Sequence, residues 1–348
     1  MRIPAELRCV AHGERFRVGV GGPGASVDAV HALACPLGCT VPVVRGIPRF
    51  VASDDYAAAF GWQWKHFQRS QLDSHTGTTI SRDRLTRCLG GTLDVVRGKS
   101  VLEAGCGAGR FTEILLEAGA RVVAADLSSA VEANHANCGR HPDYFVCQAD
   151  IRTLPVAARS FDVVVCLGVI QHTPVPEQTI AALAGYVKPG GLLVIDHYSR
   201  DYPVTPPRRA LREILLRMPP ERARRVALGT ARALLPVHRA LWSRRRGFGR
   251  LRRYLSRVSP VVDYYEAYPQ LGRELLSEWA VLDTHDTLTD RYKHLRGPDE
   301  IRDTLVALGM TDVDVSIGGN GVEARARGAA PPSASPDDTR ARRTIEAH

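Results

Sequence analysis

The sequence lacks a long apolar run and an apolar segment near its start. Its 348 residues contain no stretch of 18 apolar residues, so we expect no transmembrane helix. The first residues, Met1-Arg-Ile-Pro-Ala-Glu-Leu-Arg-Cys9, do not form the apolar centre of a secretory signal. We therefore expect a cytoplasmic protein, in which the eight cysteines are thiols or metal ligands rather than disulfides.

Acidic residues are scarce in one region of this basic chain. The net charge is +9, and residues 207–258 contain only Glu213 and Glu221 as acids among pairs and triplets of arginine. The segment predicts a basic surface for an anionic partner, either a phosphate-bearing molecule or a membrane. Solvated arginines over a helical lid, with no partner, are the alternative.

Glycine is concentrated at alternate positions of the run 101–112. Val101 and Leu102 predict a short buried strand, and Gly105, Gly107 and Gly109 follow it. Apolar residues at helical spacing then occupy 111–118. A strand, a glycine loop and a helix in this order allow a ligand to approach the backbone and the free N–H groups of the helix.

Acidic residues stand at the ends of the next predicted strands. Asp126 ends the strand 121–126 about 20 residues after the loop, where a carboxylate can accept both hydroxyls of a ribose. Asp150 ends the strand 144–150, and apolar strands at 160–168 and 187–196 complete the series. Because acids also cap helices, N-capping is the alternative role for Asp126 and Asp150.

Together these motifs resemble class I S-adenosylmethionine-dependent methyltransferases of the type 11 kind. The shared features are Glu103-Ala-Gly-Cys-Gly-Ala-Gly109, the acid after the second strand, the Ala-Asp pair after the third, and Lys188-Pro-Gly-Gly-Leu-Leu193. The resemblance implies an α/β fold with a Rossmann-like, doubly wound sheet of seven strands, built from residues 96–198 and completed by a helix and two strands in 297–328. It also implies S-adenosylmethionine as cofactor, bound by Glu103 at the methionine ammonium, by Asp126 at the ribose, and by Gly105, Cys106, Gly107, Gly109, Leu127, Asp150, Ile151 and Leu167.

Residues 1–50 predict a small separate module. Cys9 with His12, and Cys35 with Cys39, form two candidate metal knuckles that could make a closed tetrahedral zinc site. The segment 35–50 resembles small zinc-ribbon proteins and the zinc-ribbon activators of methyltransferases, although those usually carry cysteine at the position of His12 and a shorter second knuckle. A metal-free ribbon is the alternative, with His31 as a substitute ligand.

Three segments lie outside the predicted core and the N-terminal module, and of these the insertion 199–296 should determine the substrate. Residues 51–95 predict a helical cover, in which the family resemblance gives Tyr56, Gln71 or Arg84 contact with the methionine end. Residues 199–296 predict a basic helical insertion, and residues 329–348 a disordered tail.

Polar residues after the fourth strand face the transferable methyl group in this family. Gln171 and His172 stand there, and His172 could take a hydroxyl proton, although packing under the loop is the alternative. The insertion adds His285 and Tyr292 as candidate acceptor-site residues, in a cluster with Asp283 and Asp286 that could also hold a divalent cation.

The resulting functional hypothesis is methyl transfer to a small molecule, such as a sugar, a lipid-linked compound or a secondary metabolite, with oxygen the favoured acceptor atom. An RNA methyltransferase with an N-terminal zinc module is the first alternative. The Asn/Asp-Pro-Pro-Tyr/Phe motif of enzymes that methylate exocyclic amines of nucleobases is absent after the fourth strand, which makes nucleic acid a less favoured substrate. A non-catalytic cofactor-binding scaffold is the second alternative.

Overall fold

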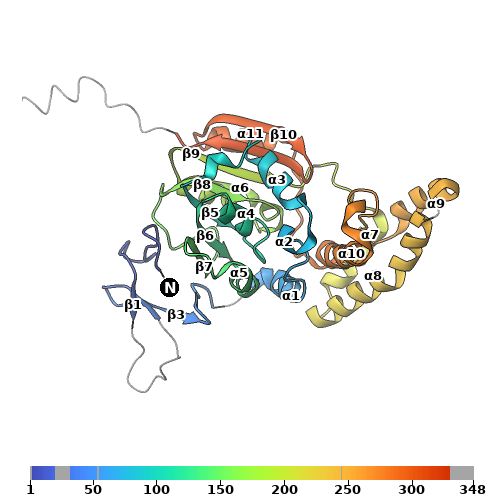
Figure 1. The fold of residues 1–348 in the computed structure, drawn as a ribbon, viewed down its shortest axis with the longest axis horizontal. Coiled ribbons are helices and arrows are strands. Elements are labelled where there is room, and N and C mark those ends of the chain that lie inside the picture. Colours follow the sequence, from blue (N-terminus) through green and yellow to red (C-terminus); the bar gives the residue numbers. More distant parts are fainter. Residues whose placement is uncertain (1, 20–31, 53–54, 244, 330–348) are drawn as a thin grey trace, which may run out of the picture.

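A seven-stranded sheet forms the centre of the protein (Figure 1). The computed structural model describes residues 2–19, 32–52, 55–243 and 245–329. The strands lie in the order β10-β11-β9-β8-β5-β6-β7, and β11 runs antiparallel to both of its neighbours. The five strands from β9 to β7 are mutually parallel, so the fold predicted from the sequence is confirmed. The strands are β5 (Ser100–Ala104), β6 (Arg121–Asp126), β7 (Tyr144–Gln148), β8 (Phe161–Cys166), β9 (Val187–His197), β10 (Thr311–Gly318) and β11 (Gly321–Arg327).

Helices cover both faces of this sheet because its strands are apolar on both sides. Neighbouring residues of β5 show this, since Val101 and Leu102 belong to two different buried clusters on opposite faces. The covering helices are α4 (Thr112–Glu117), α5 (Val131–Cys138), α6 (Pro176–Tyr186) and α11 (Pro298–Ala307). The chain order reverses between β5 and β8, and in such sheets ligands bind beyond the carboxyl ends of the strands at that point.

The N-terminal segment forms a small antiparallel sheet that packs on the edge of the core. Its strands are β1 (Arg17–Gly19), β2 (Ala32–Ala34), β3 (Thr40–Val44) and β4 (Ile47–Pro48). Leu7, Phe16 and Leu33 are buried in the same cluster as the core strands, and a bridge joins Leu7 to Val156. Docking therefore supplies apolar burial that so small a module lacks by itself. His31, the substitute ligand considered above, lies outside the described residues.

The helical cover and the insertion meet on one side of the sheet (Figure 1). The cover contains the 3-10 helices η1 (Asp55–Ala57) and η2 (Asp94–Val96) and the helices α1 (Ala58–His66), α2 (Asp73–Thr76) and α3 (Ile80–Cys88). The insertion contains α7 (Pro206–Leu216), α8 (Pro220–Ser243), α9 (Arg245–Val258), η4 (Pro269–Leu271) and α10 (Gly272–Thr289). A further 3-10 helix, η3 (Ile170–His172), follows β8.

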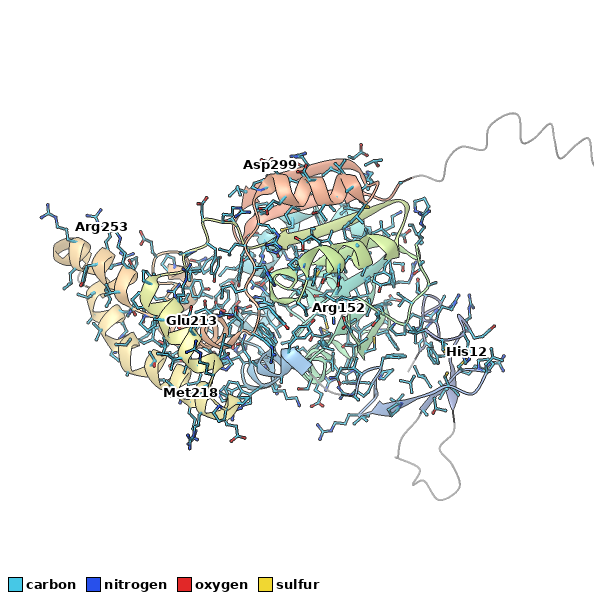
Figure 2. All side chains as sticks on the ribbon, turned by 180° about the vertical axis from the view of Figure 1, so that it is seen from behind. His12, Arg152, Glu213, Met218, Arg253 and Asp299 are labelled. Carbon is cyan, nitrogen blue, oxygen red and sulfur yellow. The ribbon has the colours of Figure 1, made fainter. Side chains whose placement is uncertain are left out.

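Of the helices in the basic insertion, α7 and α8 pack on α10, and α9 lies farthest from the sheet (Figure 1). Figure 2 shows Arg253 near the outer end of α9, on the opposite side of the molecule from His12 in the N-terminal module. None of the helices in the described ranges combines the length and the apolar character that a bilayer crossing needs. Residues 330–348, most of the tail predicted to be disordered, are not among the described residues.

Candidate functional site

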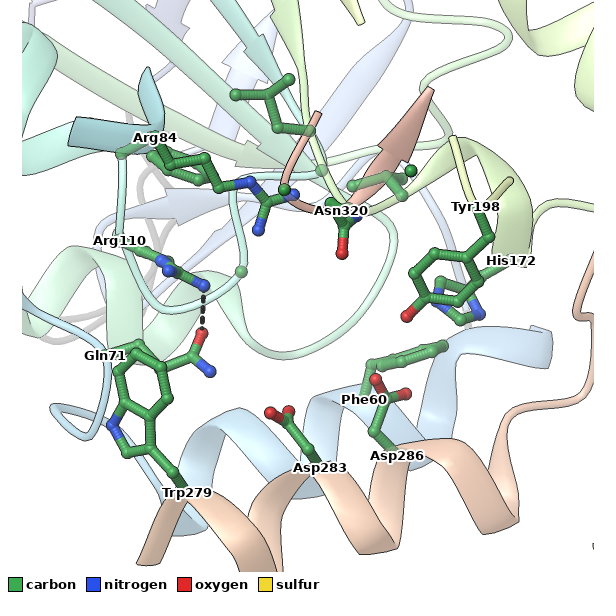
Figure 3. A pocket seen from close by; sticks show the side chains of 18 of the residues that line it. Phe60, Gln71, Arg84, Arg110, His172, Tyr198, Trp279, Asp283, Asp286 and Asn320 are labelled. Atoms are coloured by element: carbon green, nitrogen blue, oxygen red, sulfur yellow. Dashed lines mark hydrogen bonds between the residues drawn. The ribbon is translucent and has the colours of Figure 1, made fainter. Parts of the chain in front are cut away.

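A cavity of about 800 Å³ lies at the carboxyl ends of the parallel strands. One part, which we call the strand-end half, is formed by Gly105, Cys106, Gly107, Asp126, Leu127, Ile151 and Leu167. The other part, the helical half, is formed mainly by side chains of helices and of the loops beside them. Figure 3 shows its wall, which includes Phe60, Gln71, Arg84, Arg110, His172, Tyr198, Trp279, Asp283 and Asp286.

The glycine loop after β5 needs glycine for two separate reasons. Gly105 has φ of +80°, and a Cβ atom there would lie 2.3 Å from Cγ2 of Val169. Gly107 has φ of +48°, and its Cβ would lie 3.3 Å from Nε1 of Trp64. The loop is therefore a backbone surface at the cavity wall, which a ligand can approach as closely as the sequence pattern predicted.

Asp126 stands at the end of β6 and lines the cavity. Its Oδ2 accepts a hydrogen bond from the Gly107 N–H at 2.9 Å. Its Oδ1 accepts from the N–H and the hydroxyl of Ser128 at 2.8 and 2.7 Å. These donors fix the carboxylate beside the glycine loop, where it fits the two hydroxyls of a ribose.

Three residues assigned to the cofactor do not line the cavity. Glu103 is only 3% exposed and accepts a hydrogen bond from the Thr112 hydroxyl at 2.5 Å. Burial, opposed by that hydrogen bond and reinforced by the charge of Asp126, raises the pKa of Glu103 to about 8. Gly109 faces Cys138 in the packing below the loop.

Asp150 is the third of these residues, and it forms an ion pair with a near neighbour. Its Oδ2 lies 2.6 Å from Nη2 of Arg152, and its Oδ1 accepts from the Arg152 backbone N–H at 2.9 Å. Burial works against ionisation, but these contacts with Arg152 lower the pKa of Asp150 below its usual value. In the structure Asp150 is paired with Arg152 and does not line the cavity, whereas the next residue, Ile151, does.

His172 faces the helical half, as the sequence predicted for a residue after the fourth strand. Its Nδ1 lies 3.1 Å from the carbonyl oxygen of Tyr292 and 3.3 Å from Oδ2 of Asp290. Since both neighbours accept hydrogen bonds, Nδ1 carries the proton and Nε2 is the basic nitrogen. Asp290 is 1% exposed and is held by Arg212 and Lys293 at 2.7 and 2.8 Å.

The residues of α10 that line the cavity differ from His285, the residue of this helix predicted to contact the acceptor. Trp279, Asp283 and Asp286 are spaced at i, i+4 and i+7, so they share the helix face that lines the cavity. His285 points elsewhere: its Nδ1 lies 2.8 Å from Oε1 of Gln63, and burial lowers its pKa to about 4. His285 does not line the cavity, so the structure does not place it where its predicted role requires.

Tyr292 and Gln171 also lie outside the cavity wall. The Tyr292 ring packs edge-on against Tyr56, with centroids 5.5 Å apart, and only its carbonyl oxygen reaches His172. Gln171 is completely buried. By contrast, Tyr56, Gln71 and Arg84 all line the cavity, as expected for the helical cover.

Two arginines of the helical half have different partners. Arg84 forms an ion pair with Asp196, whose Oδ1 accepts from the Gly168 N–H at 2.5 Å. Arg110 binds the side-chain oxygens of Gln71 and Ser81 at 2.8 and 2.9 Å and has no carboxylate partner among the described residues. Burial, together with the nearby charge of Arg84, lowers the pKa of Arg110 to about 10. Arg110 is a buried cation that directly follows the glycine loop, but no sequence motif predicted it as a site residue.

The four predicted metal ligands meet in the N-terminal module. Nδ1 of His12 lies 3.7, 3.4 and 3.5 Å from the sulfur atoms of Cys9, Cys35 and Cys39. Bond lengths of about 2.0–2.3 Å in a tetrahedral zinc site imply ligand separations of about 3.5 Å. Cys9, His12 and Cys35 form a group whose ligand atoms all lie within 4.8 Å of one another, whereas Cys39 is near His12 but is not part of that group. Three of the four predicted ligands are therefore close enough to hold one metal ion.

A second group of potential metal ligands, His172, Asp286 and Asp290, lies at the cavity. Asp290 already pairs with Arg212 and Lys293. These two cations make a divalent ion unfavourable there.

Comparison with known proteins identifies the core. Residues 102–195 match the family model described as a methyltransferase domain. This match assigns residues 102–195 to a methyltransferase domain. The resemblance to class I enzymes is thereby confirmed for this segment, and the strand-end half of the cavity fits S-adenosylmethionine through the open glycine loop and the fixed carboxylate of Asp126.

Curated relatives match about a third of the chain. The chain is 36% identical to a ubiquinone biosynthesis O-methyltransferase of Coxiella burnetii over 110 residues, which are 31% of this chain and 47% of the relative. It is 38% identical to the protein of the same name from Idiomarina loihiensis over 112 residues, 31% of this chain and 46% of that one. The chain thus spans about half the length of the curated relatives it matches.

The chain is also similar in fold to a solved structure of a magnesium protoporphyrin IX methyltransferase from Synechocystis PCC 6803 with bound S-adenosylmethionine. It is 13% identical, with 74% of this chain and 80% of that chain covered and a TM-score of 0.37.

Proposed function

We propose that the protein transfers a methyl group from S-adenosylmethionine to a small-molecule acceptor, with oxygen as the favoured acceptor atom. The observation that carries this proposal is one continuous cavity, in which the glycine loop and Asp126 lie on one side and His172 on the other. The O-methyltransferases named above support it through the matched segment. Asp126, Leu127, Ile151 and Leu167 are the side chains that we assign to the cofactor.

The chain's own residues would position, cover and deprotonate the acceptor. The cofactor supplies a methyl group on a positively charged sulfur, which is already an activated leaving group. The helices α1 and α10 cover the cavity and exclude water, and the helical half orients the acceptor in line with the methyl group.

His172 supplies the base in this scheme. Its Nε2 would accept the proton of the acceptor hydroxyl, and the bound cofactor would supply the methyl group that this oxygen takes up. Asp290 and the Tyr292 carbonyl hold the Nδ1–H, which keeps Nε2 basic and oriented toward the acceptor. Asp290 acts through His172 and is a positioning residue.

A screen for turnover tests the proposal directly. The purified full-length protein is incubated with S-adenosylmethionine and a panel of hydroxylated and amine-bearing small molecules, and formation of S-adenosylhomocysteine is measured. We expect acceptor-dependent product with at least one small molecule and none with RNA. Transfer to RNA alone, or cofactor binding without any turnover, would contradict the proposal in favour of the RNA methyltransferase or the scaffold.

We propose separately that the N-terminal module binds one structural zinc ion through Cys9, His12, Cys35 and Cys39. Metal analysis should find about one zinc per chain, as for other tetrahedral structural sites. Cys35→Ser should remove the metal, whereas Cys88→Ala, which changes a buried cysteine of the core, should retain it. A metal-free wild-type protein of normal stability would leave a ribbon held by docking alone.

We infer that α9 contacts an anionic membrane surface. We also propose that the protein is cytoplasmic, so that this surface would be the cytoplasmic face of a membrane. Leu251, Tyr254 and Val258 are exposed on α9, and Arg250, Arg253 and Arg257 are exposed beside them. Such a helix can lie in an anionic lipid interface. Binding to vesicles that contain phosphatidylserine, lost when the three arginines are changed to Gln, would support this contact, and equal binding to phosphatidylcholine vesicles would contradict it.

A further inference from the structure

The helical half contains two carboxylates, Asp283 and Asp286, that basic groups among the described residues offset only through space. Arg110 and Arg84 act on Asp283. His172, Lys293 and Arg212 act on Asp286. Asp283 and Asp286 point into the cavity from α10, across from Arg84 and Arg110 (Figure 3). Within the described part of the chain, neither aspartate forms an ion pair with lysine or arginine. Asp283 accepts a hydrogen bond from the Tyr264 hydroxyl, and Oδ1 of Asp286 is buried without a hydrogen-bond partner.

The nearby cations are already bound to other groups. Arg84 pairs with Asp196, and Arg208 donates to the carbonyl oxygens of Pro203, Pro260 and Val261. Arg110 binds Gln71 and Ser81. Because its two partners are neutral, Arg110 acts through space on Asp283, and this wall offsets part of the charge of the two aspartates without forming an ion pair with either.

Two ionised carboxylates close together in a buried part of the cavity are unfavourable. Burial, followed by the repulsion of Asp286, raises the pKa of Asp283 to about 7. Burial likewise raises the pKa of Asp286. A ligand that brings a positive charge between them would offset the cost of keeping both ionised, whereas an anionic ligand would increase it.

We propose that the acceptor of this methyltransferase is a cationic small molecule, which carries a protonated amine that Asp283 and Asp286 bind while His172 faces the hydroxyl to be methylated. This inference rests on the proposed function and narrows its substrate to hydroxylated amines. The aromatic residues Tyr264, Tyr268 and Trp279 line the same part of the cavity and would shield the amine from water. Arg110 lies on the opposite wall, and in this proposal it would bind the anionic carboxylate end of the cofactor.

A matched set of small probes tests the charge preference without knowledge of the true acceptor. The protein is saturated with S-adenosylhomocysteine, and binding of benzylammonium, benzyl alcohol and benzoate is measured by calorimetry or NMR titration. We expect benzylammonium to bind at least about tenfold more tightly than benzyl alcohol, and benzoate not to bind. Equal binding of the three probes, binding of none, or preference for benzoate would overturn the proposal.

Variants of the two aspartates test whether they cause the preference. In Asp283→Asn and Asp286→Asn the advantage of benzylammonium over benzyl alcohol should disappear, while Glu213→Gln, a change at an exposed acid of α7, should leave it intact. Affinity for S-adenosylhomocysteine should stay within about twofold of the parent protein in all three variants. A preference that survives in both asparagine variants would contradict the assignment.

One rival occupant of the two carboxylates is the cofactor's own sulfonium. In that case the asparagine variants would weaken S-adenosylmethionine by tenfold or more relative to S-adenosylhomocysteine, which has no such charge. We expect the ratio of the two affinities to remain unchanged. The turnover screen stays a separate test: acceptors that are turned over but carry no amine would leave the methyltransferase intact and overturn only the cationic acceptor.

Discussion

The strand-end half and the helical half of the cavity are made from different kinds of groups. The strand-end half presents backbone at Gly105 and Gly107, one fixed carboxylate at Asp126, and apolar side chains. The helical half presents ionisable side chains that come from segments more than a hundred residues apart, such as Arg110 and Asp283. A site built from backbone tolerates little variation, whereas a wall of side chains can be changed without altering the sheet. In the function we propose, the strand-end half binds the cofactor and the helical half binds the acceptor.

The largest expected effect is a loss of turnover, without loss of cofactor binding, when His172 in the helical half is changed. His172→Ala should reduce kcat by about 10²–10⁴-fold on the acceptor that the screen identifies, because a general base contributes that much. S-adenosylhomocysteine affinity should stay within about twofold, as calorimetry would show. His75→Ala, at an exposed histidine of α2, is the matched control.

Asp290→Asn refines the same test. If Asp290 orients His172, kcat should fall while KM and cofactor affinity hold. A fall in cofactor affinity in either variant would break the division between the halves, and a full rate in His172→Ala would exclude it as the base.

The sequence predicted the strand-end half better because that half is local. The strand 121–126 was placed to the residue, and Asp126 followed from its position at the strand end. The ion pair of Asp150 with Arg152, only two residues away, could not be read from the sequence, so the cofactor contact expected of Asp150 stays a prediction. Local patterns therefore locate the strand ends but not the direction in which each side chain points.

The helical half was less predictable because it depends on tertiary placement. Trp279, Asp283 and Asp286 share one face of α10, and only the packed position of this helix shows that the face meets the cavity and that His285 does not. Asp290 could not be assigned from sequence, because His172 reaches it across 118 residues of chain.

A smaller effect is expected in the strand-end half. Asp126→Ala should weaken S-adenosylhomocysteine binding by about 100-fold, since two hydrogen bonds from ribose hydroxyls to a charged group contribute about 1.5 kcal/mol each. The exposed Asp143→Ala is the control for the loss of a surface carboxylate. Isothermal titration calorimetry measures both variants, and affinity unchanged by Asp126→Ala would remove the cofactor from this half.

The smallest expected effect concerns Glu103, which the sequence assigned to the cofactor but the structure buries behind the loop. Its pKa of about 8 lies above the value near 4.5 in the unfolded chain, so the folded state retains a proton that the unfolded state has released. Stability should therefore fall as pH rises from about 4.5 to 8, by at most roughly 5 kcal/mol. Thermal unfolding of ligand-free Glu103→Gln should show a shallower slope over this window, whereas the exposed Glu221→Gln should match the parent protein.

The same measurement with cofactor decides between the two assignments of Glu103. An ammonium group held beside the carboxylate would lower its pKa, so bound S-adenosylhomocysteine would flatten the slope of the parent protein between pH 4.5 and 8. A buried carboxylate with no contact to the ligand would keep its raised pKa, and the slope would persist in the complex. Since Glu103 does not line the cavity and already binds Thr112, we expect the slope to persist. A flattened slope would instead extend the strand-end half to Glu103 and restore the role predicted from its sequence motif.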